Sequence, residues 1–238
     1  MTHWIKNTEC PNCGSKDNLG VYSDGSTWCW GCRKYTPPKS QEVIKSWLDK
    51  SKRSDFNINV KLPEDAQPFL PEHAKRWLSK YNLTKEELYV LSPLYSFDRD
   101  LLIFPVYGPS GILMYQGRYF GEKEGYPKYL TYGAKDLLHI LGELSPRIVV
   151  TEDLISAIKV SSITTAMPLW GSNIPLRLAT RLSERFSRLS IWLDMNKAKE
   201  SLIMRSTLSP LFEHIDSIIT PLDPKEYSHE QIAEFVGG

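Results

Sequence analysis

The pattern of apolar and polar residues divides the chain into three stretches. Between Cys32 and about Pro63 the sequence is polar, whereas 101–106 and 112–119 are apolar runs separated by the turn sequence Gly108-Pro109-Ser110-Gly111. Two such runs joined by a short Gly- and Pro-rich segment predict a β-hairpin. From residue 147 onward, short apolar runs alternate with amphipathic segments, which predicts alternating strands and helices.

The alternating stretch has a regular order. The predicted strands lie at 148–150, 163–167, 189–193 and 215–219. The predicted helices lie at 153–161, 173–187, 197–209 and after Ser228. Strands that each precede a helix imply a parallel sheet covered on both faces.

The stretch before the hairpin is predicted to be helical. Apolar positions between residues 71 and 90 suggest two short helices broken at Asn82-Leu83-Thr84, and Thr84 with Glu87 has the spacing of a capping box. A further helical turn is predicted at 43–48, inside a polar tether.

These patterns predict an α/β protein, and two Cys-x2-Cys pairs between residues 10 and 32 add a small β zinc ribbon at its N-terminus. We divide the chain into a ribbon (1–36), a flexible basic linker (37–63), an α+β basic subdomain (64–146) and an α/β parallel-sheet domain (147–238). A length of 238 residues is enough for a sizeable core in addition to the ribbon.

The net charge of +1 gives no global reason to expect a polyanionic partner. Basic residues are nevertheless concentrated locally: residues 33–61 contain eight Lys or Arg and three acids. This stretch, and the arginines at helical spacing between 177 and 188, are equally consistent with nucleic-acid contact and with a solvated surface. Without an apolar run that could cross a bilayer or an N-terminal targeting pattern, we expect a soluble, cytoplasmic protein.

The four cysteines of the chain form two close pairs, Cys10-x2-Cys13 and Cys29-x2-Cys32. Two such pairs joined by a hairpin-length connection bring four thiolates to the corners of one tetrahedron, so a structural zinc site is predicted. Two disulfides or four unrelated thiols are the alternatives, which the absence of a secretory signal and of cysteines in the rest of the chain disfavours. Aromatic and polar residues around the second pair suit contact with unstacked bases.

Acids follow two of the predicted parallel strands, as Glu152-Asp153 and as Asp194-Met195-Asn196. Open α/β sheets bind their ligands at the carboxyl ends of the strands. Oxygen ligands from two such strand ends suit Mg²⁺. Acids at strand ends also cap the following helices, and the residues alone favour that alternative.

The arrangement as a whole resembles a known family. Glu152 and Asp194 resemble the glutamate and the first acid of the Asp-x-Asp motif of the Toprim domain, which primases, topoisomerases and recombination proteins share. The segments 100–106, 111–118 and 127–130 resemble the basic subdomain that precedes Toprim in bacterial and phage primases. The cysteine pairs resemble the zinc ribbon of phage primase-helicases, and the order of these parts matches over nearly the whole chain.

The resemblance implies a DNA primase that makes short RNA primers on single-stranded DNA from ribonucleoside triphosphates. It implies that Glu152, Asp194 and Asn196 bind catalytic Mg²⁺. The residues implied to contact nucleic acid or nucleotide are Arg118, Lys128 and Lys135 in the core and Asp24, Ser26 and Trp28 in the ribbon. A phage-encoded protein in a bacterial cytoplasm is expected. No Gly-x4-Gly-Lys-Ser/Thr motif is present, so a helicase or polymerase partner would be a separate protein.

The sequence also departs from the Toprim pattern. Asn196 replaces the second acid of Asp-x-Asp, Asp153 and Lys199 replace glycines, and Ser156 replaces an acid. Asp223 is a further acid, although a turn residue is the favoured interpretation. A chain that has lost catalysis therefore stays open, as does a non-catalytic DNA-binding protein of replication or recombination with a RecR-like role; a Toprim nuclease fits poorly.

Overall fold

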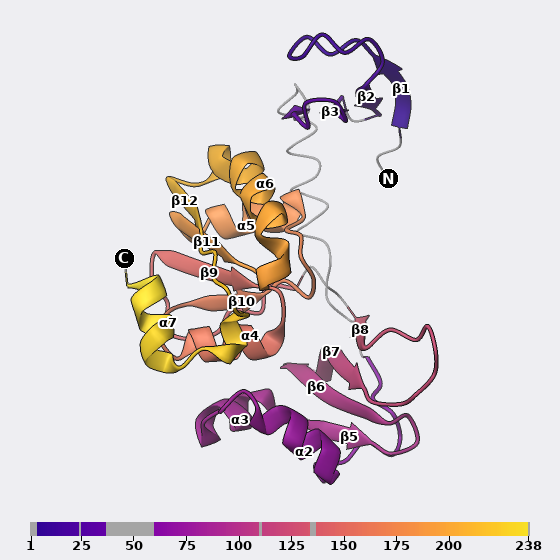
Figure 1. Cartoon of the computed structure of the whole chain (residues 1–238), viewed down its shortest axis with the longest axis vertical. Coiled ribbons are helices and arrows are strands. Elements are labelled where there is room, and N and C mark those ends of the chain that lie inside the picture. The colour runs from indigo at the N-terminus through magenta and orange to yellow at the C-terminus, as the bar shows by residue number, and fades with distance from the viewer. Residues whose placement is uncertain (1–3, 24, 37–59, 110, 134–136, 238) are drawn as a thin grey trace. The chain divides into compact units, whose positions relative to one another are not determined.

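The computed structural model describes residues 4–23, 25–36, 60–109, 111–133 and 137–237. The chain forms two compact units, residues 1–57 and 58–238, shown in Figure 1. The helical turn predicted at 43–48, and nearly all of the predicted linker, lie outside the described residues.

The first unit contains a four-stranded antiparallel sheet in the order β1-β2-β3-β4. Its strands are β1 (Trp4–Thr8), β2 (Leu19–Tyr22), β3 (Thr27–Cys29) and β4 (Tyr35–Thr36). Gly20 on β2 lies beneath the ring of Trp30, where an added Cβ would be 2.5 Å from ring carbons. Only glycine therefore permits this close approach of the ring to the backbone.

The second unit begins with two helices and a second antiparallel sheet, in the order β5-β6-β7-β8. The elements are α2 (Glu72–Ser79), α3 (Lys85–Leu91), β5 (Leu94–Ser96), β6 (Leu101–Gly108), β7 (Gly111–Tyr119) and β8 (Tyr129–Gly133). The predicted hairpin is β6–β7, and β5 and β8 extend it on both sides. Side chains alternate along β6 between two apolar clusters, as the period of a strand requires.

The remainder of the second unit is a parallel sheet in the order β10-β9-β11-β12. Its strands are β9 (Arg147–Thr151), β10 (Ala166–Pro168), β11 (Arg188–Trp192) and β12 (His214–Ser217). The helices are α4 (Leu154–Ser161), α5 (Leu176–Ser183), α6 (Ala198–Leu208) and α7 (His229–Val236), with single 3-10 turns η1 (Met195–Lys197), η2 (Ser209–Leu211) and η3 (Pro224–Glu226). The predicted fold class is confirmed.

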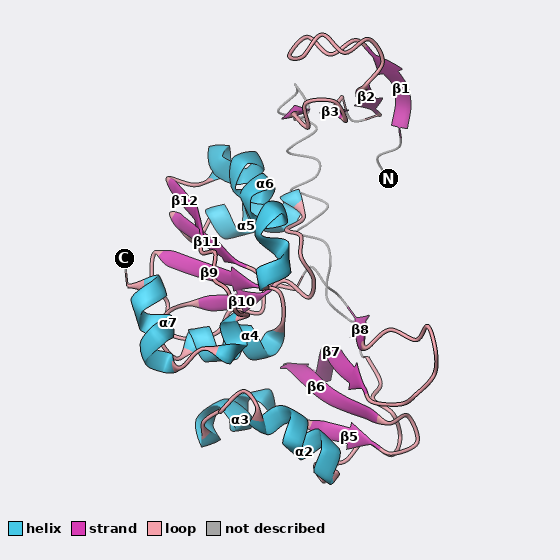
Figure 2. Ribbon diagram, in the orientation of Figure 1, coloured by secondary structure: helices cyan, strands magenta, loops and turns pink. Residues whose placement is uncertain are grey.

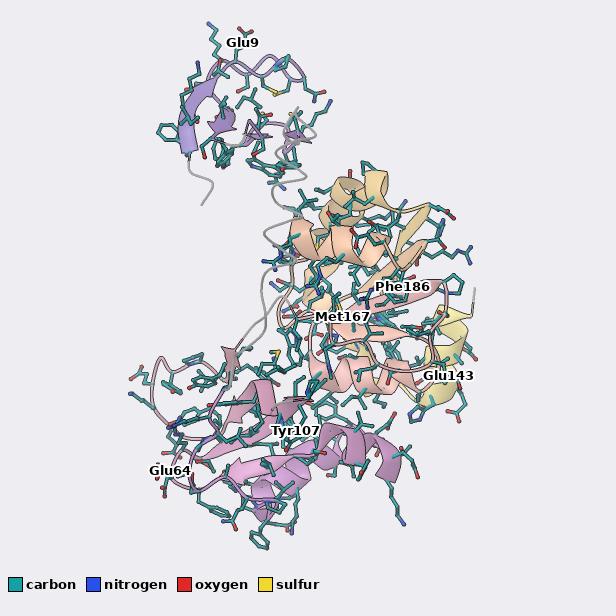
Figure 3. The ribbon with its side chains drawn as sticks, turned by 180° about the vertical axis from the view of Figure 1, so that it is seen from behind. Glu9, Glu64, Tyr107, Glu143, Met167 and Phe186 are labelled. Carbon is teal, nitrogen blue, oxygen red and sulfur yellow. The ribbon has the colours of Figure 1, made fainter. Side chains whose placement is uncertain are left out.

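Helices cover both faces of the parallel sheet, as Figure 2 shows. On one face α5 and α6 bury the cluster that includes Met167 and Phe186, labelled in Figure 3. On the other face α4 and α7 pack against Val149 and Trp192. Strands buried on both sides explain why the runs at 148–150 and 189–193 are apolar, apart from the buried Ser190, rather than alternating.

Side-chain caps mark where several helices begin. Thr84 and Glu87 form the predicted capping box of α3, with Glu87 N donating to Thr84 Oγ1 and Thr84 N donating to Glu87 Oε2. Ser228 caps α7 in the same manner. Helix α5 is shorter than the predicted 173–187, because Pro175 stands at its N-cap and the helix ends before Glu184.

Two polar contacts join the antiparallel and parallel parts of the second unit. The Lys159 ammonium on α4, 2% exposed, donates to the carbonyls of Tyr81 at 2.9 Å, Lys225 at 3.2 Å and Tyr227 at 2.5 Å. The Glu87 carboxylate pairs with His229 Nε2 at 2.7 Å. One apolar cluster also combines α2 and β6 with α4. The predicted division of this unit at residue 146 stays a prediction.

None of the helices in the described ranges has the length and hydropathy that crossing a bilayer requires.

Candidate functional site: a thiolate cluster and a carboxylate edge

The four cysteines come together in the first unit. Their Sγ atoms all lie within 4.8 Å of one another, with 3.8 Å between Cys10 and Cys32 and 3.7 Å between Cys13 and Cys29. Zinc–sulfur bonds of about 2.3 Å in a tetrahedron place the sulfurs about 3.8 Å apart. The four thiols therefore fit a closed zinc site, and the predicted ligand set is supported.

Neighbouring groups stabilise the thiolate form of Cys32. Asn12 Nδ2 lies 3.4 Å from Cys32 Sγ, and the Lys34 ammonium donates to Asn12 Oδ1 at 3.0 Å. The Asn12 side chain and the Lys34 backbone N–H lower the pKa of the Cys32 thiol to about 6. Because zinc binds thiolates, these donors favour the metal-binding form of Cys32.

The proposed base-reading residues of the ribbon differ in exposure. Ser26 is 4% exposed and Trp28 on β3 is half-buried, while Asp24 lies outside the described residues. Among the residues of this unit that the structure describes, the exposed rings are Trp4 (54%) and Trp30 (50%). Sequence reasoning had not singled out Trp4, because the exposure of a ring depends on what packs against it in the folded unit, and all five residues of β1 are exposed.

The acids at the parallel sheet follow its two central strands. Thr151 and Trp192 are direct partners in the β9–β11 pair, so Glu152 and Asp194 continue from adjacent strand ends. The strand order reverses direction between β9 and β11, and such a switch point is where open α/β sheets bind ligands. The predicted convergence of these two strand ends is present.

Helix capping explains only one of these acids. Asp153 is the N-cap of α4, and its Oδ1 accepts from the Ser156 backbone at 2.9 Å. Asp194 precedes η1 without capping it through its side chain. Glu152 Oε2 and Asp194 Oδ1 are buried and have no hydrogen-bond partner among the described residues. Two carboxylate oxygens without donors at one sheet edge are suited to a cation.

We call the acids at the carboxyl ends of β9 and β11, with Asp223 at the N-cap of η3, the carboxylate edge: Glu152, Asp153, Asp194 and Asp223. Lys225 belongs to the same site and was not predicted from the sequence. Its ammonium lies 2.8 Å from Asp153, 3.2 Å from Asp223 and 3.4 Å from Asp194, each time at Oδ2. Asp223 is indeed a turn residue, because it caps η3, and its Oδ1 also accepts from the Met195 backbone at 3.1 Å. The three aspartates come from separate segments, so no local pattern marks Lys225.

For both Asp194 and Lys225, burial and the neighbouring opposite charges shift the pKa in opposite directions. Burial raises the pKa of Asp194 to about 7, against the lowering effect of Lys225, and burial also raises the pKa of Glu152. For Lys225, burial would lower the pKa, but the attraction of Asp153, Asp194 and Asp223 exceeds that effect and raises it. Lys225 is therefore a permanently charged cation within the edge.

The acids do not form a compact cage of the thiolate type. Within the described ranges, the cysteines are the one group of three or more His, Cys, Asp or Glu whose ligand atoms all lie within 4.8 Å. Asn196, predicted as a third magnesium ligand, is exposed on η1. An open edge with few protein ligands is the arrangement in which Mg²⁺ retains waters and substrate oxygens.

Arg118 on β7 is surrounded by aromatic rings. Its guanidinium lies 5.8 Å from the ring centre of Trp77, 5.5 Å from that of Phe120 and 5.1 Å from that of Tyr129. Its Nε and Nη1 are buried without hydrogen-bond partners among the described residues. A guanidinium with unsatisfied donors is suited to an anionic group such as phosphate.

Tyr129 connects Arg118 with the carboxylate edge. Burial raises the pKa of the Tyr129 hydroxyl, and the next contributions come from Asp153 and Lys225, so these charges lie within electrostatic range. Lys128, its neighbour, is exposed, and Lys135 lies outside the described residues. The Tyr129 hydroxyl itself lies within electrostatic range of Arg118, Asp153, Asp194 and Lys225.

No family model and no curated protein matches the chain. Among solved structures, the primase fragment of the bacteriophage T7 primase-helicase protein is 17% identical, with a TM-score of 0.50 over 98% of this chain and 100% of that chain. The zinc-binding and RNA polymerase domains of the Aquifex aeolicus primase are 14% identical, with a TM-score of 0.57 over 99% of this chain and 80% of that chain. The chain has a primase-type fold.

Proposed function

We propose that the protein is a DNA primase, which synthesises short RNA primers on single-stranded DNA from ribonucleoside triphosphates. One observation carries the proposal: Glu152 and Asp194 present unpartnered oxygens at the switch point of a parallel sheet whose chain follows the primase fold over nearly its whole length. In this proposal the parallel-sheet part is a Toprim domain and the antiparallel part is its basic subdomain.

The catalytic residues of the proposal are Glu152, Asp194 and Asn196. The orphaned oxygens of the two acids fit Mg²⁺, and the Asn196 amide, exposed beside them in sequence, would hold the ion directly or through water. Mg²⁺ bound there would neutralise charge on the reacting phosphates. Arg118 and Lys128, with Lys135, would hold phosphates of nucleotide or template.

The ribbon supplies template selection in this proposal. Zinc fixes the ribbon sheet, and Asp24, Ser26 and Trp28 would contribute to reading the start site. Because Ser26 is buried, its contribution would be to shape the β2–β3 turn, and the exposed rings of Trp4 and Trp30 are better placed to stack on unpaired bases. A separate helicase or polymerase would use the primers, in a bacterial cytoplasm if the protein is phage-encoded.

The test combines labelled ribonucleotides, Mg²⁺ and single-stranded DNA with the zinc-loaded full chain. We expect template-dependent RNA of a few nucleotides. Glu152→Gln should lower its rate by at least about 100-fold, because charge stabilisation by a metal is worth several kcal/mol. Glu184→Gln, at the exposed end of α5, is the matched control and should be unaffected.

Single-stranded DNA binding should survive Glu152→Gln, which separates loss of chemistry from loss of template. Normal synthesis by this variant would remove Glu152 from the catalytic site. A wild-type chain that binds DNA and makes no RNA would instead favour the non-catalytic, RecR-like alternative.

A further inference from the structure

Lys225 is the least exposed charged group of the carboxylate edge. Its side chain is 10% exposed, and the ammonium contacts three aspartates that come from the ends of β9 and β11 and from the turn η3. An ammonium has three N–H donors. Two of them donate to Asp153 and Asp194, and the charge also pairs with Asp223 Oδ2 at 3.2 Å, so one aspartate oxygen from each segment faces the ammonium.

The backbone around Lys225 is fixed on both sides. Lys159 donates to the carbonyls of Lys225 and Tyr227, and Asp223 and Glu226 form a capping box across the turn. The Tyr227 hydroxyl in turn accepts from the Leu222 backbone at 3.0 Å. The turn thus directs the lysine into the edge, in contrast to an exposed lysine whose position is set by solvent.

The remaining oxygens of the edge can be assigned one by one. Oδ2 of all three aspartates faces Lys225, Asp153 Oδ1 accepts from Ser156 and Asp223 Oδ1 accepts from Met195. The oxygens that stay buried without a partner are Glu152 Oε2 and Asp194 Oδ1. Two oxygens, each from a different acid, are enough to hold one divalent cation that keeps its waters. The other aspartate oxygens, which a second ion would need, are already engaged by Lys225, by the Ser156 and Met195 backbones and, at Asp153 Oδ2, by both Lys225 and the Ser156 hydroxyl.

Two-metal phosphoryl-transfer sites hold their ions about 3.5–4 Å apart between shared carboxylates. At this edge an ammonium lies between the carboxylates of Asp153, Asp194 and Asp223. We propose that Lys225 is a built-in cation that occupies the place of a second metal ion, so that the edge binds a single divalent cation at Glu152 and Asp194. This inference rests on the proposed function, since it concerns the metal requirement of that same site.

Mn²⁺ is the probe, because the paramagnetic resonance signal of the free ion reports directly how many ions each chain binds. The zinc-loaded full chain is titrated as wild type, as Lys225→Met and as Lys197→Met. Lys225→Met should gain one bound Mn²⁺ per chain relative to wild type. Lys197 is a matched control: it lies near the same edge but pairs with Glu200, so its loss should leave the count unchanged.

The thermal transition of Lys225→Met shows whether this variant is folded, and a second variant tests the charge argument independently. Lys225→Met/Asp223→Asn deletes one positive and one negative charge together, and it should lose the additional ion while keeping the wild-type count. A folded Lys225→Met chain with the wild-type count, or a double variant that still binds the additional ion, would overturn the inference.

Primer synthesis is measured on the same samples, so the two proposals can fail separately. An active primase whose Lys225→Met variant binds no additional Mn²⁺ contradicts the built-in cation alone. A chain that makes no primers but gains the ion contradicts the proposed function alone.

Discussion

The two units hold themselves together in different ways. In the described part of the first unit, the buried residues are Cys10, Gly20, Ser26 and Cys29, none with a large apolar side chain. The second unit buries extended apolar clusters on both faces of its parallel sheet. We therefore expect the first fold to depend on zinc and the second to depend on apolar burial.

The same contrast applies to how each unit treats a cation. The four thiols of the ribbon are placed to complete the coordination of one zinc ion and would leave no open position, as a structural site requires. The carboxylate edge is open, and it already contains the ammonium of Lys225. The first unit therefore offers a closed set of four sulfur ligands, whereas the second offers two unpartnered carboxylate oxygens at an open site.

Zinc removal should have the largest effect and should be confined to the ribbon. Structural zinc in small domains contributes about 10–16 kcal/mol of apparent binding free energy, so chelation is expected to unfold residues 4–36. Backbone amide NMR signals of the ribbon should collapse, while the thermal transition of the second unit is unchanged. Cys29→Ser should reproduce the effect; dispersed ribbon signals in a metal-free sample would contradict it.

Trp192→Ala tests the other side of the comparison. Trp192 is fully buried in the second unit and donates to Thr220 Oγ1 at 2.8 Å, so its loss should cost about 3–5 kcal/mol of unfolding free energy. Denaturant titration measures the change, and zinc content should stay at the wild-type level. Trp30→Ala is the matched control in the ribbon, and it should leave the midpoint of the second unit in place.

Separating the two units should abolish the choice of primer start sites while leaving RNA synthesis in the second unit. A fragment of residues 58–238 keeps Val60, whose N–H donates to the Ile112 carbonyl at 3.0 Å, so the second unit stays intact. We expect this fragment to extend a supplied dinucleotide on single-stranded DNA but to lose its choice of start sites. Mapping primer 5′ ends checks this; unchanged start sites would show that the ribbon is not the reader.

Asn196→Asp should have the smallest effect, because the residue is exposed. One additional negative charge about 4 Å from a divalent ion in a solvated edge is worth about 1–2 kcal/mol. We therefore expect the Mg²⁺ concentration for half-maximal synthesis to fall by about fivefold. Ser206→Asp, on the exposed surface of α6, controls for the added charge. An unchanged or raised Mg²⁺ requirement in Asn196→Asp would show that this position does not face the ion.

Local sequence patterns were sufficient to predict much of the fold. Cysteine spacing identified the thiolate cluster, the Thr84–Glu87 spacing identified the start of α3, and alternating apolar runs identified the parallel sheet. Each depends on residues close together in the chain or on a period repeated within one element. Strands β5 and β8 lacked such a signal, because they are short and become strands only by pairing with β6 and β7.

The carboxylate edge was only partly predictable for the same reason. Glu152 and Asp194 follow apolar strands and could be found from that position. Lys225 could not, because Asp194 and Asp153 lie 31 and 72 residues before it and reach it only through the order of the strands. The exposure of Trp4 and the burial of Ser26 likewise depend on which residues pack against them in the folded ribbon.

Lys159 limits how this protein can be re-engineered. A single nitrogen atom contacts three backbone carbonyls, one from the turn after α2 and two from the turn that carries Lys225. A chimera that takes its antiparallel half from another protein must supply a carbonyl where that of Tyr81 lies, or the ammonium loses one of its ligands in a buried position. Compatibility of exchanged halves should therefore follow main-chain geometry at residue 81 more closely than side-chain identity there.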